Sequence, residues 1–249
     1  MKIVVIGGTG LIGSQVVARL GEHGHQAVAA APSTGVNTIT GDGLSGVLTG
    51  ADVVVDVSNS PSFADADVLA FFTTATTNIV AAARTAGVGH YVALSIVGTD
   101  VLPDSGYLRA KVAQEKLITG SGIPYTILRA TQFYEFGHAI ADSATVDGTV
   151  RLPGAPAQPM AAVDVAAVVA RTAAAAPRNG IAETGGPEEL TLAGWVGTVL
   201  AAHGDPRRVV PDPESTYFGT RLTDASLVPG EGAQLADTTL AAWLEAHPA

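Results

Sequence analysis

The sequence predicts an α/β fold, a Rossmann-type doubly wound parallel sheet with a small C-terminal lobe. Two patterns predict it. Short apolar runs alternate with helical stretches over the first half of the chain, and a glycine-rich turn follows the first run. Strands that are apolar on both faces and are separated by helices are typical of a parallel sheet covered on both sides.

The first elements lie at the N-terminus. Residues 2–6 are all compatible with a strand, and apolar side chains recur at helical spacing from Leu11 to about Gly21. Further apolar runs predict more strands, with helical stretches between them. The strands are expected at 26–31, 52–57, 90–95 and 124–128 and the helices near 67–86 and 106–120, and the stretch 36–40 could supply one more short strand.

The second half of the chain loses this alternation after Arg129. We expect residues 1–130 to form the sheet domain and residues 131–249 a smaller substrate-binding lobe, interleaved with the first as one compact unit. Doubly wound sheets have their ligand crevice beyond the carboxyl ends of the strands, where this lobe is expected. Its helices are predicted from about Asp164 to Ala175, near 191–203 and near 237–247.

Composition excludes several classes of protein. The 249 residues contain 13 Lys and Arg against 23 Asp and Glu, and a net charge of −10 without a basic cluster would repel nucleic acid. The absence of cysteine excludes disulfides and thiolate chemistry, and six histidines without metal-ligand spacing predict no bound metal. No signal peptide and no apolar stretch of membrane-spanning length are recognised, so a soluble cytoplasmic protein is predicted.

A turn rich in glycine joins the first strand to the first helix. It covers residues 7–14, with glycines at 7, 8, 10 and 13. In such a turn the first glycine permits a sharp bend, the next lets backbone N–H groups approach a pyrophosphate, and the last allows close helix packing. The residues predicted to bind the pyrophosphate of NAD or NADP are Gly7, Thr9, Gly10, Leu11, Ile12 and Gly13.

The end of the second strand bears on the choice between NADP and NAD. NAD enzymes usually carry an acidic residue there for the ribose 2′-hydroxyl, whereas residues 29–34 contain none. A missing carboxylate removes a repulsion against a 2′-phosphate, and Ser33 and Thr34 could donate hydrogen bonds to it. NADP is therefore predicted, with NAD as the alternative. No Lys or Arg lies between Arg19 and Arg84, and the two hydroxyls could instead belong to an ordinary turn.

Three side chains suggest proton transfer beside this cofactor. Ser95 ends the fourth long strand, and Tyr107 and Lys111 lie four residues apart on one face of the next helix. A carbonyl that accepts hydride needs a proton on its oxygen, and a phenol is a weak acid at neutral pH. We expect Lys111 to lower the pKa of Tyr107 and the Ser95 hydroxyl to hold the substrate oxygen. The alternative is a solvent-exposed helical pair.

With these motifs the chain resembles the short-chain dehydrogenase/reductase superfamily, in particular its atypical, NmrA-like NAD(P)H-binding branch. The resemblance extends over essentially the whole chain. Besides the motifs above, it rests on segments 41–44, 56–59, 93–98 and 123–134 and on Asn78. The glycine spacing is that of the extended members rather than the short enzymes, and the branch contains members that bind NAD(P) without known turnover.

The resemblance implies further contacts with the cofactor. Asp42 is expected near the adenine, and Asn59 and Ser60 in the cofactor groove. Lys111 would also touch the nicotinamide ribose. The turn after the fifth long strand would flank the nicotinamide with Ala130, Thr131 and Phe133.

The substrate pocket is expected to combine the proton-transfer set with residues that follow two strands. Its candidates are Ser95, Val97, Tyr107, Phe133 and Tyr134. The aromatic side chains at 133, 134 and 136 could equally pack in the core. Few charged residues lie between 131 and 160, which favours a small, apolar or aromatic substrate. The oligomeric state is open, and a homo-oligomer is compatible with the sequence.

These observations predict an NADP-dependent reductase that transfers hydride to a carbonyl, a quinone or an activated double bond, with Tyr107 supplying the proton. Two alternatives stay open. An isomerase, epimerase or dehydratase would use the same cofactor without net redox. A redox sensor would bind NAD(P) and report to a partner protein without turnover, because fold alone does not decide function.

Overall fold

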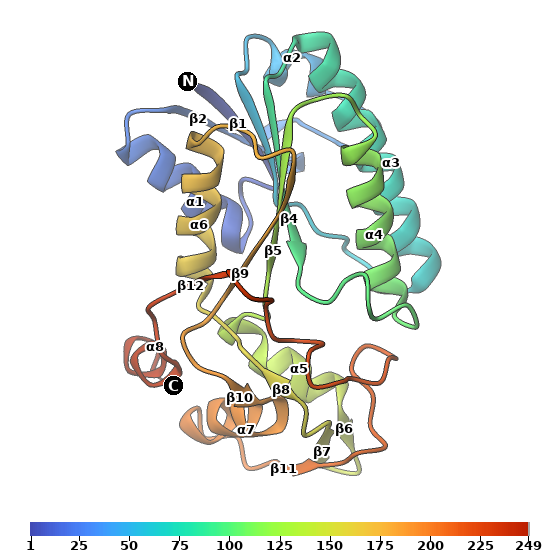
Figure 1. Ribbon diagram of the computed structural model, residues 1–249, viewed down its shortest axis with the longest axis vertical. Coiled ribbons are helices and arrows are strands. Elements are labelled where there is room, and N and C mark those ends of the chain that lie inside the picture. The colour runs from blue at the N-terminus through green and yellow to red at the C-terminus, as the bar shows by residue number, and fades with distance from the viewer. Residues whose placement is uncertain (249) are drawn as a thin grey trace. The chain divides into compact units, whose positions relative to one another are not determined.

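The computed structural model describes residues 1–248 and centres on one large sheet (Figure 1). Its strands are β1 (Lys2–Ile6), β2 (Gln26–Ala30), β3 (Val53–Asp56), β4 (His90–Ile96), β5 (Tyr125–Ala130), β9 (Gly180–Gly185) and β12 (Gln234–Leu235). The order across the sheet is β12-β9-β5-β4-β3-β1-β2, and β1 runs parallel to both of its neighbours. This is the Rossmann-like arrangement that the sequence predicts.

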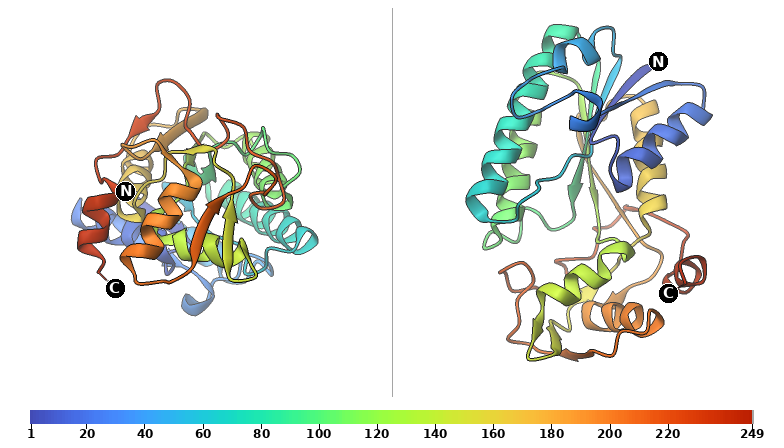
Figure 2. Two further views of the ribbon diagram at one scale, coloured as in Figure 1. Left: turned by 90° about the horizontal axis from the view of Figure 1, so that it is seen from below. Right: turned by 180° about the vertical axis from the view of Figure 1, so that it is seen from behind.

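Helices cover both faces of this sheet (Figures 1 and 2). α1 (Leu11–Glu22) and α6 (Ala162–Ala174) lie against one face, and α3 (Asp65–Ala86) and α4 (Gly106–Thr119) against the other. The helices predicted near 67–86 and 106–120 are thereby confirmed. A short helix, α2 (Leu44–Leu48), precedes β3.

Buried aliphatic side chains hold the sheet and its helices together. Val4 and Ile6 of β1 and Val54 of β3 pack in one cluster with Ile79 of α3 and Ile118 of α4, and all five are at most 1% exposed. Complete burial of one such side chain contributes roughly 1.5–3 kcal/mol. The strands therefore have to be apolar on the faces that meet helices, which is the pattern seen in the sequence.

The chain reverses its winding at β1. That strand pairs with β2 on one side and with β3 on the other. In doubly wound folds, the crevice at such a reversal is the usual ligand site. Gly7 follows β1 directly, so the glycine turn lies at this point of the sheet.

The stretch 36–40 does not form the short strand that it could have supplied. The Asn37 side chain accepts hydrogen bonds from the backbone N–H groups of Ile39 and Thr40, at 2.9 and 3.3 Å. The Asn37 N–H in turn donates to Asp42 O at 2.9 Å. Local bonds of this kind compete with a strand ladder, and here they close the segment into turns.

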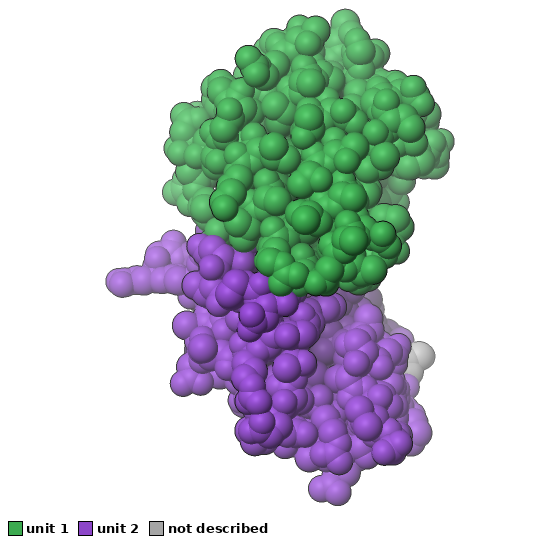
Figure 3. Space-filling view, turned by 90° about the vertical axis from the view of Figure 1, so that its right-hand side faces the viewer, with its two compact units in different colours: residues 1–95, 106–129, 165–182 green, residues 96–105, 130–164, 183–249 purple. Residues whose placement is uncertain are grey.

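The chain divides into two compact units, coloured separately in Figure 3. The first comprises residues 1–95, 106–129 and 165–182, and the second comprises 96–105, 130–164 and 183–249. Within the second unit, β11, β7 and β6 form a small sheet and β8 pairs with β10. Its short elements are α5 (Gly137–Ser143), β6 (Thr145–Val146), β7 (Thr149–Leu152), β8 (Pro156–Ala157), β10 (Leu190–Thr191), α7 (Leu192–Ala202), β11 (Arg208–Pro211) and α8 (Leu240–Ala246).

Helix α3 corrects the expectation that the chain has no apolar stretch of membrane-spanning length. α3 has 22 residues and is long and apolar enough to cross a membrane by length and composition. Val68, Phe72 and Ile79 of this helix are buried within the first unit, and Asp65 and Asp67 lie in its first turn. The apolar side chains of α3 thus pack within the first unit, as in the core helix of a sheet domain.

Candidate cofactor and proton-transfer site

The glycine turn after β1 is fixed by backbone bonds and by close packing. Gly7 has a φ of +78°, a conformation that favours glycine, and the Gly10 N–H donates to Gly7 O at 3.0 Å. A Cβ on Gly8 would lie 2.7 Å from Ala29 Cα, and a Cβ on Gly13 would overlap Gly7 O. The turn itself therefore requires glycine at 7, 8 and 13.

Gly10 differs because a Cβ there would make only an ordinary van der Waals contact. A Cβ there would meet Gly7 O at 3.4 Å, and its φ of −82° with ψ of −177° suits any residue. No side chain caps the first turn of α1, and no acidic residue lies in that turn. Backbone N–H groups at a bare helix N-terminus bind anions, so the turn fits the pyrophosphate of NAD(P). Of the other predicted contacts, Thr9 and Leu11 are exposed and Ile12 is buried.

Ser33 and Thr34, which follow β2, differ in their contacts. The Thr34 Oγ1 accepts a hydrogen bond from the Ala31 N–H at 2.9 Å and lies 3.0 Å from Ala31 O. This hydroxyl is engaged by the turn itself, as the alternative interpretation of the sequence had it. Ser33 is exposed, and no acidic residue lies beside it in the chain. Ser33 is therefore the better candidate for a 2′-phosphate contact.

Tyr107 lies near the start of α4 and bonds to the loop after β3. Its hydroxyl donates to Asn59 Oδ1 at 3.0 Å, and its ring packs against Phe63 and Phe72 with centroid distances of 5.4 and 6.1 Å. The same Asn59 oxygen accepts a bond from the Ser60 N–H at 2.9 Å. The structure thus brings the predicted proton donor to the two predicted groove residues.

The protonation of Tyr107 corrects one prediction. Burial raises the pKa of Tyr107 to about 12, and the hydrogen bond to Asn59 opposes that rise only in part. The sequence argument expected Lys111 to lower this pKa instead. A phenol with this pKa is protonated throughout the neutral range.

The Lys111 side chain explains the difference. It is 3% exposed, and its ammonium donates to Leu94 O at 2.9 Å and to Gln114 Oε1. The same Nζ lies 4.5 Å from the centroid of the Phe72 ring. Lys111 therefore bonds to β4 and to its own helix, and not to the hydroxyl of Tyr107. Burial lowers the pKa of Lys111 to about 8, although Asp56 and Glu115 act in the opposite direction.

This lowered pKa predicts how stability depends on pH. The folded pKa of Lys111 is about 8 and the ordinary value is 10.5, so the unfolded chain holds the proton more tightly. Below pH 8 Lys111 is charged in both the folded and the unfolded state, so the free-energy cost of burying its charge is fully present. Between pH 8 and 10.5 the folded state loses this proton first, so rising pH removes the cost and stabilises the folded state. The difference between the folded and the ordinary pKa of Lys111 corresponds to a free energy on the order of 3 kcal/mol.

We expect the free energy of unfolding of the wild type to rise relative to that of Lys111→Met between neutral pH and about pH 10. Urea unfolding of both proteins at a series of pH values measures this difference. The comparison with Lys111→Met cancels the contributions of titrating groups that do not interact with Lys111. Parallel curves for the two proteins would show that Lys111 carries no such burial cost.

Ser95 is also bonded within the protein. It is 2% exposed, and its hydroxyl donates to Glu115 Oε1 at 2.6 Å. Glu115 is held in turn by a buried ion pair with Arg129, at 2.8 Å. The Ser95 hydroxyl is therefore engaged with α4 in this structure, and its contact with a substrate oxygen stays a prediction.

The remaining predicted residues have contacts of their own. Asp42 accepts a hydrogen bond from Thr40 Oγ1 at 2.7 Å within the loop before α2. In the second unit, Phe133 is half-buried and stacks on Phe136 at 5.5 Å. Val97, Ala130 and Thr131 are buried in the second unit.

Tyr134 belongs to the core of the second unit and not to an open pocket. It is fully buried, and its ring lies 5.6 and 6.5 Å from the rings of Trp243 and Trp195. Its hydroxyl donates to Thr238 O at 3.3 Å. Of the two interpretations left open by the sequence, core packing is the one that the structure supports for this residue.

Sequence reasoning missed a buried polar cluster in the first unit, which we call the Asp56 cluster: Asp56, Tyr91, Lys111 and Gln114. Asp56 Oδ2 accepts hydrogen bonds from Tyr91 Oη at 3.1 Å and from Gln114 Nε2 at 2.9 Å. The available signal was an acidic residue at the end of an otherwise apolar strand. Such a residue is rarely buried unless it is paired.

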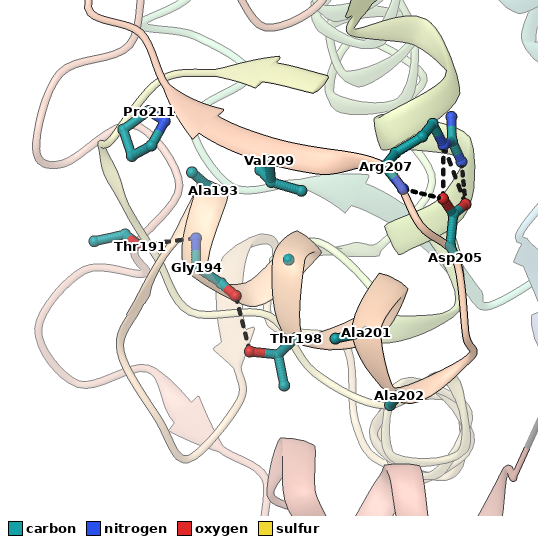
Figure 4. A pocket seen from close by; sticks show the side chains of 11 residues that line it. Thr191, Ala193, Gly194, Thr198, Ala201, Ala202, Asp205, Arg207, Val209 and Pro211 are labelled. Carbon is teal, nitrogen blue, oxygen red and sulfur yellow. Dashed lines mark hydrogen bonds and ion pairs between the residues drawn. The ribbon is translucent and has the colours of Figure 1, made fainter. Parts of the chain in front are cut away.

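The second unit has a groove of about 820 Å³ that contains none of the predicted residues (Figure 4). α7 and β11 form its walls, and Arg207 is bonded there to Asp205 at 2.6 Å. The Thr198 hydroxyl is engaged with Gly194 O at 2.9 Å. Because its polar side chains are already paired, the groove offers little to hold a cofactor.

The comparison with protein families decides the cofactor class. The family model described as NAD(P)H-binding matches residues 7–176. The chain belongs to this NAD(P)H-binding family. The match begins at Gly7, the first residue of the glycine turn, and it confirms the resemblance to the atypical short-chain dehydrogenases and reductases.

Individual proteins resemble the chain over most of its length. It is 29% identical over 223 residues to a (4-alkanoyl-5-oxo-2,5-dihydrofuran-3-yl)methyl phosphate reductase of Streptomyces griseus, covering 83% of this chain and 75% of that one. A solved structure of the NADPH-dependent quinone oxidoreductase QOR2 with NADPH, from Escherichia coli, is 22% identical, with a TM-score of 0.65 over 84% of this chain and 77% of that one. MoeE5 in complex with UDP-glucose and NAD is 20% identical, with a TM-score of 0.72 over 98% of both chains. The two structural likenesses show the fold.

Proposed function

We propose that this protein is an NADPH-dependent reductase that transfers hydride to a carbonyl, a quinone or an activated double bond of a small molecule. The observation that carries the proposal is the glycine turn at the uncapped N-terminus of α1, in a chain of the NAD(P)H-binding family. The similarity to the Streptomyces griseus reductase supports the NAD(P)H-dependent reductase class.

Each residue of the site has a defined task in this proposal. The backbone N–H groups of Leu11, Ile12 and Gly13 hold the pyrophosphate, because those of Gly7, Gly8 and Gly10 already donate to backbone carbonyls. When bound, NADPH supplies the hydride. Tyr107 gives the proton to the substrate oxygen, and its pKa of about 12 keeps it in the protonated form that donation requires. In the structure the phenol O–H donates to Asn59 Oδ1, so it has to turn from Asn59 to the substrate oxygen before the proton is transferred.

The substrate class follows from composition and from similarity. Four charged residues lie between 131 and 160, namely Glu135, Asp142, Asp147 and Arg151. A small molecule with an apolar or aromatic body and a reducible carbonyl or quinone fits this composition, and the similarity to the quinone oxidoreductase QOR2 supports the quinone. We place this activity in the cytoplasm.

A sensor that binds NAD(P) without turnover is the second candidate. One observation favours it, because the Ser95 hydroxyl and the Lys111 ammonium are both engaged in buried bonds away from Tyr107. Net oxidation of NADPH together with product formation distinguishes a reductase from a sensor. Product formation without net oxidation would instead indicate an isomerase, epimerase or dehydratase.

Cofactor preference provides a test of the NADP assignment. We expect the wild type to bind NADPH more tightly than NADH, and Ser33→Asp to weaken NADPH binding by about tenfold or more, because a carboxylate beside the 2′-phosphate repels it. Fluorescence titration of each protein with both nucleotides measures the four dissociation constants. The control is Ser143→Asp, an exposed site in the second unit with the same change in charge. Equal affinities of the wild type for NADPH and NADH would contradict the predicted preference for NADP.

A further inference from the structure

The ammonium of Lys111 lies in a buried polar environment that the mechanism above does not use. Lys111, Asp56 and Gln114 are 3%, 1% and 1% exposed. Gln114 Oε1 accepts a hydrogen bond from Lys111, and Gln114 Nε2 donates to Asp56 Oδ2 at 2.9 Å. The amide therefore links the ammonium on α4 to a carboxylate at the end of β3.

The direction of this link is fixed by chemistry. An ammonium only donates hydrogen bonds and a carboxylate only accepts them, so the amide oxygen has to face Lys111 and the amide nitrogen has to face Asp56. The carboxylate is itself fixed by Tyr91 Oη at 3.1 Å and by the Ser58 hydroxyl at 2.6 Å. The glutamine amide accepts from the ammonium and donates to the carboxylate without a change in its own protonation.

We propose that Gln114 is the positioning residue for Lys111: its amide ties the ammonium to the fixed carboxylate of Asp56 and so determines where the ammonium lies and how readily it releases its proton. The positioning is a property of the protein without cofactor and stands apart from the proposed reductase function. Gln114 would act through Lys111 and would not touch the substrate.

The surroundings of Lys111 make the effect measurable. The charged groups that face it are Asp56 of β3 and Glu115 of α4, and the Phe72 ring of α3 lies 4.5 Å away. Glu115 is paired with Arg129 of β5, which offsets part of its charge. Removal of the amide oxygen would take away a hydrogen bond that favours the charged amine while the site stays dry. The pKa of Lys111 should then fall further.

Lysine titration by NMR tests this inference directly, on cofactor-free protein with isotope-labelled lysine. The chain contains Lys2, Lys111 and Lys116, and Lys111→Met assigns the signal. In Gln114→Leu we expect the Lys111 midpoint to fall by about half a pH unit or more. In Gln114→Glu a carboxylate beside the ammonium should raise it. Thr119→Val, at an exposed hydroxyl on the same helix, should leave it unchanged.

The outcomes separate positioning from a merely structural role. If Gln114 served packing alone, its loss would admit water, and the Lys111 midpoint in Gln114→Leu would rise toward the ordinary 10.5. That rise, or an unchanged Lys111 midpoint in both variants, would overturn the inference. Opposite movements in the two variants would support it, and Gln114→Glu decides alone if Gln114→Leu does not fold. A wild type without reductase activity would overturn the proposed function and leave this titration still decisive.

Discussion

Tyr107→Phe should lower turnover by roughly two to four orders of magnitude while NADPH affinity stays near that of the wild type. The substitution removes the transferable proton and keeps the ring, which packs against Phe63 and Phe72. It also removes the hydrogen bond to Asn59 Oδ1, but that oxygen keeps its bond from the Ser60 N–H. Steady-state rates and nucleotide titrations of both proteins measure the effect.

Tyr125→Phe is the matched control for this prediction. Tyr125 is half-buried at the start of β5 and packs against the core cluster of the sheet, so the same change of atoms there should leave turnover near that of the wild type. Full turnover in Tyr107→Phe would remove the acid role from Tyr107. The proton would then have to come from solvent, or the sensor function would gain support.

Gly10→Leu should abolish binding of NADPH and leave the protein folded. A Cβ at this position would make only an ordinary van der Waals contact with Gly7 O, and leucine readily adopts its extended backbone, so the fold does not require glycine there. The side chain would instead occupy the space over the N-terminus of α1 into which a pyrophosphate has to enter. A loss of at least about a hundredfold in affinity is expected, with the thermal unfolding temperature near that of the wild type.

Two other glycines give this experiment its controls. Gly21→Leu makes the same change in α1 where a Cβ has nothing within 4 Å, and it should preserve binding. Gly13→Ala should instead lower stability, because its Cβ would overlap Gly7 O. Undiminished NADPH binding by Gly10→Leu would mean that the nucleotide binds elsewhere.

The sheet and its helices could be predicted because their signals are local. A strand buried on both faces has to be apolar along its length, and the turn from Gly7 to Gly13 needs glycine for backbone reasons that are visible in the spacing. The stretch 36–40 shows the limit of this reasoning. Its composition suited a strand, but the Asn37 side chain bonds to the N–H groups of Ile39 and Thr40 and closes a turn.

The site was harder to predict because side-chain direction depends on partners far away in the chain. The four-residue spacing correctly predicts that Tyr107 and Lys111 share a face of α4, but it does not say where a flexible lysine ends. The ammonium lies in the interior because it donates to Leu94 O of β4 and to Gln114. Gln114 is bonded in turn to Asp56 of β3. In the same way, Glu115 holds the hydroxyl of Ser95 in the interior.

The central claim is that this protein consumes NADPH held at the glycine turn to reduce a small molecule. The most direct test follows nicotinamide absorbance and product together while the purified protein is offered NADPH and a panel of quinones, enones and aromatic ketones, beside Gly10→Leu. We predict that at least one compound is reduced with one NADPH oxidised per product, and that Gly10→Leu abolishes both signals. Tight NADPH binding without oxidation on any compound, or equal oxidation by Gly10→Leu, would contradict the claim.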